Sequence, residues 1–311
     1  MTKIIHSKDS LQNLHIEDQF YSGAHTLRDT FTTRFENPLH ATSDRFCWDY
    51  WRVPDQYRLL RTPAESFFGT KPFKPFLEHL LNWGRSNLGC QMISHPWLSA
   101  YIDGCYQSLH SDVPHGPWSF VYSLTPWNTR KFTGGETVIA KPKLLRYFQE
   151  VTHHQSDEHA QLFQKVEPKF NRLTVFDPRY PHGVQSVKGE EDLLASRLVI
   201  HGWFTEPRPM LEGTLPFKKI MKPLDLLALS IIHLIEPLKY SGLLSIRFHI
   251  LGSGKIGSAQ VLCAHLINPM GETLHKTALN KMLLQALMNN EIIFPKSNGP
   301  TTLTLPIEFK K

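Results

Sequence analysis

The chain has 311 residues, of which 41% are hydrophobic and 20% are charged, and its formal net charge is +6. This composition excludes collagen-like, low-complexity and wholly disordered proteins, and it supplies enough apolar material for one large domain or two smaller ones. The positive charge is modest, so we expect no nucleic-acid partner.

The N-terminal segment and the cysteines indicate where the protein works. Residues 1–14 are mostly polar or charged, no run of 18 apolar residues occurs, and the four cysteines form no C-x-x-C pair. Signal peptides and membrane-spanning helices both need apolar runs that are missing here. We therefore expect a soluble, cytoplasmic protein with free thiols and no membrane partner.

Residues 1–96 are predicted to form a mainly helical lead-in. The segment Thr62–Glu65 reads T-P-A-E, which is typical of a helix start with an N-cap, a proline at the first helical position and a capping-box glutamate. Apolar residues recur at helical spacing over Phe76–Leu88, which predicts a helix with one buried face. The aromatic run Phe46–Trp51 is expected in the core or in a pocket wall.

Short apolar and aromatic runs separated by Gly, Pro and Asp begin at Trp97 and predict strands. Many short strands with such turns are typical of a β-sandwich or barrel. One helix is expected to interrupt them, over Leu144–Lys165. The predicted strands include Leu98–Ile102, Trp118–Leu124, Thr137–Ala140, Leu173–Phe176 and Arg197–Phe204.

The C-terminal part has a different pattern. Residues 207–241 contain several prolines and one apolar helix, Leu224–Ile235, and are expected to be a linker. Residues 242–311 hold seven basic and three acidic residues, so most of the net charge lies there. We predict a small β-β-α-β domain for this region, with its elements over Leu243–Ile250, Ile256–Ile267, Thr273–Asn289 and Leu303–Phe309.

Candidate metal ligands come from two places in the strand-rich region. His110 and Asp112 are two residues apart, so an extended chain points both side chains to the same side. His182 follows a turn and opens a new strand, a position that can face back into a barrel. Two imidazoles and one carboxylate on one face of a metal are the ligand set of non-heme Fe(II) oxygenases.

Arg197 lies in a strand that is otherwise apolar. A guanidinium is costly to bury without a partner. A dicarboxylate ligand would explain the residue, because arginine binds carboxylates through paired, charge-assisted hydrogen bonds. A surface arginine paired with a nearby acid is the alternative reading.

Taken in order, these motifs resemble those of the Fe(II)- and 2-oxoglutarate-dependent oxygenases, especially their prolyl-hydroxylase-like branch. The resemblance covers residues 97–204, and residues 14–39 resemble its helical lead-in. The ordered motifs are a tyrosine ahead of H-x-D, an aromatic strand, a G-G-x-T turn, a second histidine, and an arginine six residues before W-F. In this chain they are Tyr101, His110 with Asp112, Trp118–Leu124, Gly134–Thr137, His182–Val184, and Arg197 with Trp203 and Phe204.

The resemblance implies a role for each matched residue. It implies that Fe(II) is held by His110, Asp112 and His182, and that Arg197 binds the distal carboxylate of 2-oxoglutarate. O2 is the other co-substrate, ascorbate is the expected reductant in vitro, and no catalytic residue is expected beyond the metal site. Further contacts are expected with 2-oxoglutarate from Tyr101, Tyr122 and Thr137, and with the substrate or the metal ligands from His115, Trp118 and Trp203.

The implied fold is α+β: a double-stranded β-helix, or jelly roll, with N-terminal flanking helices and the small C-terminal domain. We expect an oxygenase domain over residues 1–206, with its jelly-roll core at 97–206, then the linker 207–241 and the domain 242–311. The implied reaction is hydroxylation of an unactivated C–H bond of an amino-acid-like, peptidyl or protein substrate, with release of succinate and CO2. Halogenating relatives replace the carboxylate ligand with a small residue, so Asp112 favours hydroxylation. The alternative is a non-catalytic jelly roll that binds or senses a ligand.

The C-terminal domain resembles the C-terminal domain of the TonB family. The matching motifs are G-x-L-x-I-x-F at Gly242–Phe248, G-x-I at Gly254–Ile256, and P-I-x-F at Pro306–Phe309. The resemblance implies a module that binds a protein partner or dimerises, by addition of a strand at a sheet edge.

Overall fold

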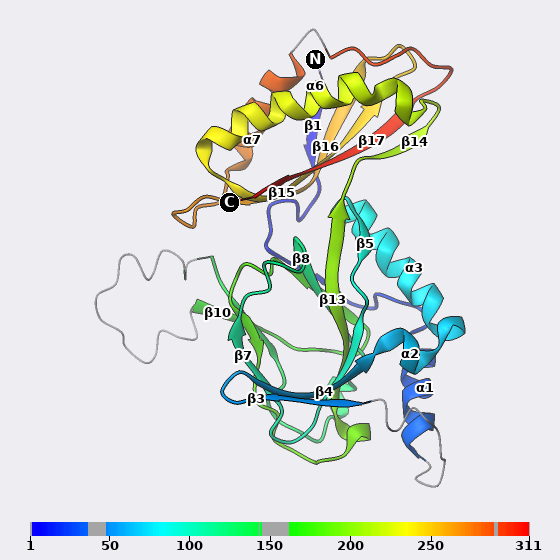
Figure 1. Ribbon diagram of the computed structural model, residues 1–311, viewed down its shortest axis with the longest axis vertical. Coiled ribbons are helices and arrows are strands. Elements are labelled where there is room, and N and C mark those ends of the chain that lie inside the picture. The colour runs from blue at the N-terminus through cyan, green and yellow to red at the C-terminus, as the bar shows by residue number, and fades with distance from the viewer. Residues whose placement is uncertain (1, 37–47, 143, 145–161, 289–291, 311) are drawn as a thin grey trace. The chain divides into compact units, whose positions relative to one another are not determined.

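The computed structural model describes residues 2–36, 48–142, 144, 162–288 and 292–310 (Figure 1). The chain divides into two compact units. The roll unit contains residues 14–81 and 92–205, and the C-terminal unit contains residues 1–13, 82–91 and 206–311. Each unit is described by itself.

The roll unit is a curled, antiparallel 12-stranded sheet with the order β10-β9-β12-β7-β4-β6-β13-β8-β11-β2, in which β3 pairs with β4 and β5 pairs with β13. Its strand-rich sequence therefore forms the jelly-roll arrangement that was expected. The strands are β2 (Leu14–Glu17), β3 (Asp49–Val53), β4 (Tyr57–Pro63), β5 (Cys90–Ile93), β6 (Trp97–Tyr101), β7 (Tyr106–His110), β8 (Trp118–Ser123), β9 (Thr137–Ala140), β10 (Phe163–Val166), β11 (Arg172–Phe176), β12 (His182–Val184) and β13 (Arg197–Pro207).

Helices α1 (Ala24–Glu36), α2 (Ala64–Phe68) and α3 (Thr70–Asn87) flank the roll. Aromatic side chains join them, because the rings of Phe31 and Phe67 lie 5.9 Å apart. Phe76 of α3 is fully buried, and its ring lies 4.6 Å from that of Tyr122 on β8. The apolar face of α3 thus covers the outer face of the sheet, as its helical spacing predicted.

The C-terminal unit is a 5-stranded sheet with the order β1-β16-β15-β17-β14. Its helices α6 and α7 lie on one face of the sheet (Figure 1), and α6 buries residues three or four positions apart, such as Ile220, Leu224, Leu227 and Ile231. The elements are β1 (Lys3–His6), β14 (Met210–Gly213), α6 (Phe217–Ile235), β15 (Ser241–Ile250), β16 (Ile256–Ile267), α7 (Lys276–Leu287) and β17 (Thr301–Phe309).

The predicted β-β-α-β order of the C-terminal region is confirmed by β15, β16, α7 and β17. The structure also adds β1, which pairs in parallel with β16 (Ile4 opposite Ala259) and so places residues 1–13 in the C-terminal unit. The expected domain boundaries assigned those residues to the oxygenase domain. The resemblance to the TonB C-terminal domain stays a prediction.

Three local predictions for the roll unit need correction. Thr62 lies in β4 and does not cap a helix, because α2 begins at Ala64 with Pro63 as its N-cap. The lead-in is not mainly helical, since β2, β3, β4 and β5 all lie before residue 97. Residues 145–161 of the helix expected over 144–165 lie outside the described residues, and Phe163–Val166 forms strand β10.

Within the described ranges, no helix is long and apolar enough to cross a membrane.

Candidate active site

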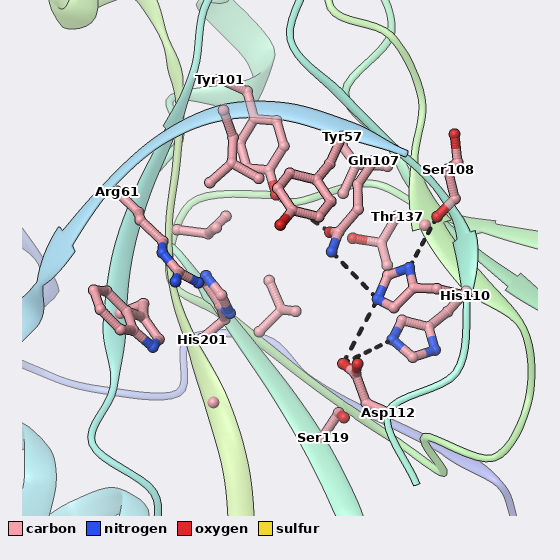
Figure 2. Close-up of a pocket in the computed structure, with 18 of the residues that line it drawn as sticks. Tyr57, Arg61, Tyr101, Gln107, Ser108, His110, Asp112, Ser119, Thr137 and His201 are labelled. Atoms are coloured by element: carbon pink, nitrogen blue, oxygen red, sulfur yellow. Dashed lines mark hydrogen bonds and ion pairs between the residues drawn. The ribbon is translucent and has the colours of Figure 1, made fainter. Parts of the chain in front are cut away.

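A cavity of about 710 Å³ opens inside the roll unit. Its walls come from β3, β4, β6, β7, β8, β9, β11, β12 and β13, so side chains far apart in sequence share one space (Figure 2). Of the candidate site residues, the structure brings into this lining Tyr101, His110, Asp112, His115, Thr137, His182, Arg197 and Trp203.

His110 and Asp112 lie where β7 ends. His110 is the last residue of the strand, and the backbone N–H of Asp112 donates to the carbonyl oxygen of Pro178 at 3.1 Å. This bond ties the H-x-D segment to the loop that precedes His182. The two side chains, which the spacing predicted to share one side, both face the cavity.

His182 opens β12, as predicted, and lies opposite His110 in the strand pairing. The turn before it is held by Asp177, whose Oδ1 accepts from the backbone N–H and the Nε–H of Arg179, both at 2.9 Å. The ring of Phe176 packs edge-on against that of His182 at 4.7 Å. These contacts fix the imidazole against the cavity wall.

The three side chains form a compact donor set. Asp112 Oδ2 lies 3.6 Å from His110 Nε2 and 3.4 Å from His182 Nε2, and the two imidazole centroids are 4.4 Å apart. The ligand atoms all lie within 4.8 Å of one another. This spacing suits one metal ion bound by two nitrogens and one oxygen.

Hydrogen bonds to the backbone select the imidazole nitrogens that face the metal position. His110 Nδ1 donates to the Ser108 carbonyl oxygen at 2.8 Å, and His182 Nδ1 donates to the Tyr180 carbonyl oxygen at 2.9 Å. The Nε2 atoms then carry the lone pairs. The side-chain amide of Gln107 donates to Nε2 of His110 at 3.2 Å. Such backbone bonds orient metal-binding histidines and fix their tautomer.

The electrostatics of the cluster keep the carboxylate ionised. Burial alone would raise the pKa of Asp112, but hydrogen bonding and charge from His110 and His182 outweigh burial and lower it. An ionised carboxylate and two imidazoles, whose Nε2 atoms bind a metal only without their protons, form a donor set that suits a divalent cation.

Arg197 begins β13 and is 1% exposed. Its Nε donates to the Gly135 carbonyl oxygen at 2.6 Å and its Nη2 to Thr137 Oγ1 at 3.0 Å. Gly135 has a φ of 80°, and a Cβ there would meet Arg197 Cδ at 3.2 Å, so glycine permits both the turn and the close approach. The G-G-x-T turn therefore cradles the guanidinium.

The remaining nitrogen of Arg197 has no partner. Nη1 is buried without a hydrogen bond, and no described carboxylate forms an ion pair with the residue. Burial lowers the pKa of Arg197 and outweighs the opposing effect of Tyr101, which reflects the cost of enclosing a cation without a carboxylate partner. Tyr101 lies opposite Arg197 in the strand pairing, and its ring centroid is 4.6 Å from the guanidinium carbon. A carboxylate from a ligand fits this orphaned donor.

Two expected contacts are wrong. Tyr122 and Trp118 lie on β8 but do not line the cavity, whereas Ser119, Phe120 and Val121 of the same strand do. The hydroxyl of Tyr122 instead donates to Asn171 Oδ1 at 2.9 Å. Trp118 is 1% exposed, and its ring lies edge-on to the ring of His15 at 5.1 Å.

His115 and Trp203 line the cavity together. Their rings stack at 4.4 Å with an interplanar angle of 29°. Trp203 Nε1 is buried without a partner among the described residues, so this pair offers a ligand one unused N–H donor beside an aromatic surface.

Several lining residues escaped the sequence analysis. They come from the lead-in, which was expected to be helical, or from strands whose facing residues only the sheet register reveals. His201 lies in the cavity wall, where its Nε2 and Ser99 Oγ are 2.8 Å apart. The others include Tyr57, Arg61, Trp97 and Gln107, whereas Trp51 belongs to the aromatic run that was expected in the core or in a pocket wall.

Comparison with known proteins agrees with this geometry. Residues 96–205 match the model of the 2OG-Fe(II) oxygenase superfamily. No curated protein matches the chain in sequence. These residues contain the three clustered donors and Arg197. They form a 2OG-Fe(II) oxygenase domain, and the protein is a 2-oxoglutarate-dependent dioxygenase whose cofactors are Fe(II), 2-oxoglutarate and O2.

Solved structures show weaker similarity. A prolyl-4-hydroxylase from Pseudomonas putida is 16% identical, with a TM-score of 0.44 over 64% of this chain and 95% of that chain. A prolyl hydroxylase from Trichoplax adhaerens, in complex with a hypoxia inducible factor peptide fragment, is 14% identical, with a TM-score of 0.40 over 64% and 86% of the two chains. HygX from Streptomyces hygroscopicus, with nickel and 2-oxoglutarate bound, is 12% identical, with a TM-score of 0.39 over 62% and 83%. These values are too low to bear on the substrate.

Proposed function

We propose that the roll unit is a hydroxylase that oxidises an unactivated C–H bond of an amino-acid-like, peptidyl or protein substrate and converts 2-oxoglutarate to succinate and CO2. One observation carries the proposal. A single cavity holds a His-Asp-His donor set and, in the same wall, a buried guanidinium with an unused N–H group.

In this proposal His110, Asp112 and His182 would hold Fe(II) through two imidazole nitrogens and one carboxylate oxygen. When bound, Fe(II) supplies the redox chemistry that couples 2-oxoglutarate and O2 to oxidation of the substrate. The backbone carbonyls of Ser108 and Tyr180 keep both imidazoles turned with Nε2 toward the metal position. The protein's contribution is therefore orientation of the ligands before any substrate arrives.

Arg197 binds the distal carboxylate of 2-oxoglutarate in this proposal. Thr137 and the Gly135 carbonyl hold the guanidinium through Nη2 and Nε, which leaves Nη1 to donate to the ligand. The charges balance, because a divalent ion beside Asp112 keeps one positive charge and Arg197 adds a second, against a dianion. Burial keeps water from competing for the same donor.

The alternative, a ligand-binding roll without catalysis, explains less. A ligand-binding roll needs no cluster of metal donors, whereas His110, Asp112 and His182 come from two strand ends and place their ligand atoms within 4.8 Å of one another. An intact carboxylate at position 112 also favours hydroxylation over halogenation, in line with the resemblance noted from the sequence.

The experiment is a titration of 2-oxoglutarate into the full chain loaded with Mn(II), followed by assay of succinate and O2 uptake with Fe(II) and ascorbate. We expect Arg197→Gln to weaken 2-oxoglutarate binding by about tenfold or more, since a charge-assisted bond is lost. The matched control is Arg130→Gln, because Arg130 stacks on Trp127 at 3.7 Å and does not line the cavity. Equal affinity in wild type and Arg197→Gln, or no succinate from the wild type, would contradict the proposal.

A further inference from the structure

A second arginine, Arg61, lies in the cavity wall and is not used by the proposed function. It belongs to β4, whose alternation turns Tyr57, Leu59 and Arg61 toward the cavity. Arg58, three positions earlier on the same strand, does not line the cavity. The placement of Arg61 therefore follows from the face of the strand on which it lies.

Two indole rings hold the Arg61 guanidinium in place. Its central carbon lies 3.2 Å from the ring centroid of Trp51 on β3 and 4.0 Å from that of Trp97 on β6. The strand pairing makes this contact, because Trp51 lies opposite Leu59 and Trp97 lies opposite Pro63, each two residues from Arg61. Stacking occupies the faces of the guanidinium and leaves the N–H groups at its edge for a ligand.

The charge of Asp49 acts on Arg61 from the neighbouring strand, but no described carboxylate is close enough to form an ion pair with it. Among the described residues it forms neither a hydrogen bond nor an ion pair, and its Nε is buried without a partner. Asp49 lies opposite in the strand pairing but is exposed and makes no ion pair with Arg61. A fixed cation with free donors, at the wall of a cavity, is a site for an anion.

The charge of the loaded cavity leads to the same conclusion. Fe(II), Asp112 and Arg197 together balance the two charges of 2-oxoglutarate, which leaves Arg61 without an anion. The only other carboxylate in the described lining, Asp55, is exposed. The anion that pairs with Arg61 is therefore expected to arrive with the substrate.

Figure 2 shows where such a substrate would lie. Arg61 and His201 are on the opposite side of the cavity from His110 and Asp112. A molecule anchored at Arg61 thus extends across the cavity toward the metal ligands, and its reacting carbon is separated from its anionic group by the width of the site.

We propose that Arg61 binds a carboxylate of the substrate, so that the enzyme acts on carboxylate-bearing amino-acid derivatives. This inference rests on the proposed function, because it takes 2-oxoglutarate to occupy Arg197. A free amino acid and the C-terminus of a peptide present the same chemistry. Arg61 is a substrate-binding residue in this account, and Trp51 and Trp97 are its positioning residues.

The test measures binding of small probes to the full chain saturated with Mn(II) and 2-oxoglutarate, where no turnover occurs. The probes are free amino acids, N-acetyl amino acids and the corresponding N-acetyl amides, followed by quenching of tryptophan fluorescence and by calorimetry. We expect at least one carboxylate probe to bind about tenfold or more tightly than its amide. Tighter binding of the free amino acids would indicate a free amino acid as the substrate. Tighter binding of the N-acetyl amino acids would indicate the C-terminus of a peptide.

Variants assign that preference to Arg61. Arg61→Gln should reduce carboxylate binding to the level of the amide and leave 2-oxoglutarate binding unchanged, whereas the matched control Arg58→Gln should keep the preference. Arg61→Lys keeps the charge but loses the planar donor edge, so it should show an intermediate preference, and it serves if Arg61→Gln does not fold.

Three results would overturn the inference: no carboxylate probe that binds more tightly than its amide, a preference that survives in Arg61→Gln, or a loss of 2-oxoglutarate binding in Arg61→Gln. Failure of the wild type to bind Mn(II) or 2-oxoglutarate would instead overturn the proposed function. The two failures are therefore distinguishable in one set of titrations.

Discussion

The C-terminal unit and the roll unit are both built mainly from antiparallel strands, but the side chains that line their interiors differ in polarity. In the C-terminal unit, the side chains between sheet and helices are leucine, isoleucine, valine, alanine and phenylalanine, as in the buried Leu244, Ile246 and Phe248 of β15. In the roll unit, the enclosed space is lined by His182, Arg197 and other polar groups that are buried as deeply as a core residue. Apolar side chains fill the interior of the C-terminal unit, whereas the cavity of the roll unit contains hydrogen-bond donors that only a ligand satisfies.

This difference separates stability from function. Burial of apolar area stabilises the C-terminal unit directly. Burial of Arg197, with Nη1 unpaired, works against folding unless a carboxylate arrives. Residues that are costly to bury are therefore the ones that indicate the site.

The largest expected effect lies in the apolar interior. Phe248 is fully buried, so Phe248→Ala should lower the free energy of unfolding by about 3–5 kcal/mol, through lost transfer energy and the cavity left behind. Urea unfolding measures this change. The matched control is Phe217→Ala, because Phe217 is 44% exposed on α6, and its effect should stay below about 1 kcal/mol. A Phe248→Ala protein as stable as the wild type would show that this interior is not the closed core described.

A smaller effect is expected at His201, in the cavity wall. Burial, together with the charges of Arg197 and Arg61, lowers the pKa of His201 to about 3. Because the folded pKa lies below that of the unfolded chain, the unfolded state binds the extra proton, and stability falls as the pH drops below about 6.5. The variant His201→Gln has no imidazole to protonate at this position. Its free energy of unfolding should therefore fall less than that of the wild type, by about 1 kcal/mol, between about pH 6 and pH 5.

Denaturant unfolding at several pH values compares the two proteins. Glutamine keeps an oxygen that can accept from Ser99 Oγ, which now lies 2.8 Å from the histidine. Parallel pH profiles for wild type and His201→Gln would mean that His201 takes up its proton in the folded protein, and the electrostatic description of the cavity would then be wrong.

The sequence predicted elements best where one force dominates. Strand β16 begins and ends at the predicted residues, Ile256–Ile267, and so does β9, Thr137–Ala140, because apolar runs bounded by turn residues leave little choice. The lead-in was harder to predict. In β4 the polar and charged residues Arg58, Arg61 and Thr62 interrupt the apolar pattern, and T-P-A-E has a helix-start composition although its threonine lies in a strand.

The site was partly predictable for the same reason. The order of motifs along the chain predicted the residues His110, Asp112, His182 and Arg197, which the structure brings into one cavity. Side-chain direction within a strand was not predictable from the motif, which is why Tyr122 was wrong. Arg61 was missed because its neighbours, Trp51 and Trp97, meet it only through the pairing of three strands.

The central claim is that one cluster of side chains binds the metal ion, and calorimetric titration of Mn(II) tests it most directly. Asp112→Asn removes the carboxylate charge at the centre of the cluster, and Asp29→Asn is the matched control on the exposed face of α1. We expect Asp112→Asn to lower Mn(II) affinity by at least about 100-fold, more than the loss of an outer hydrogen-bond partner, and Asp29→Asn to leave it unchanged. Wild-type affinity in Asp112→Asn would contradict the account.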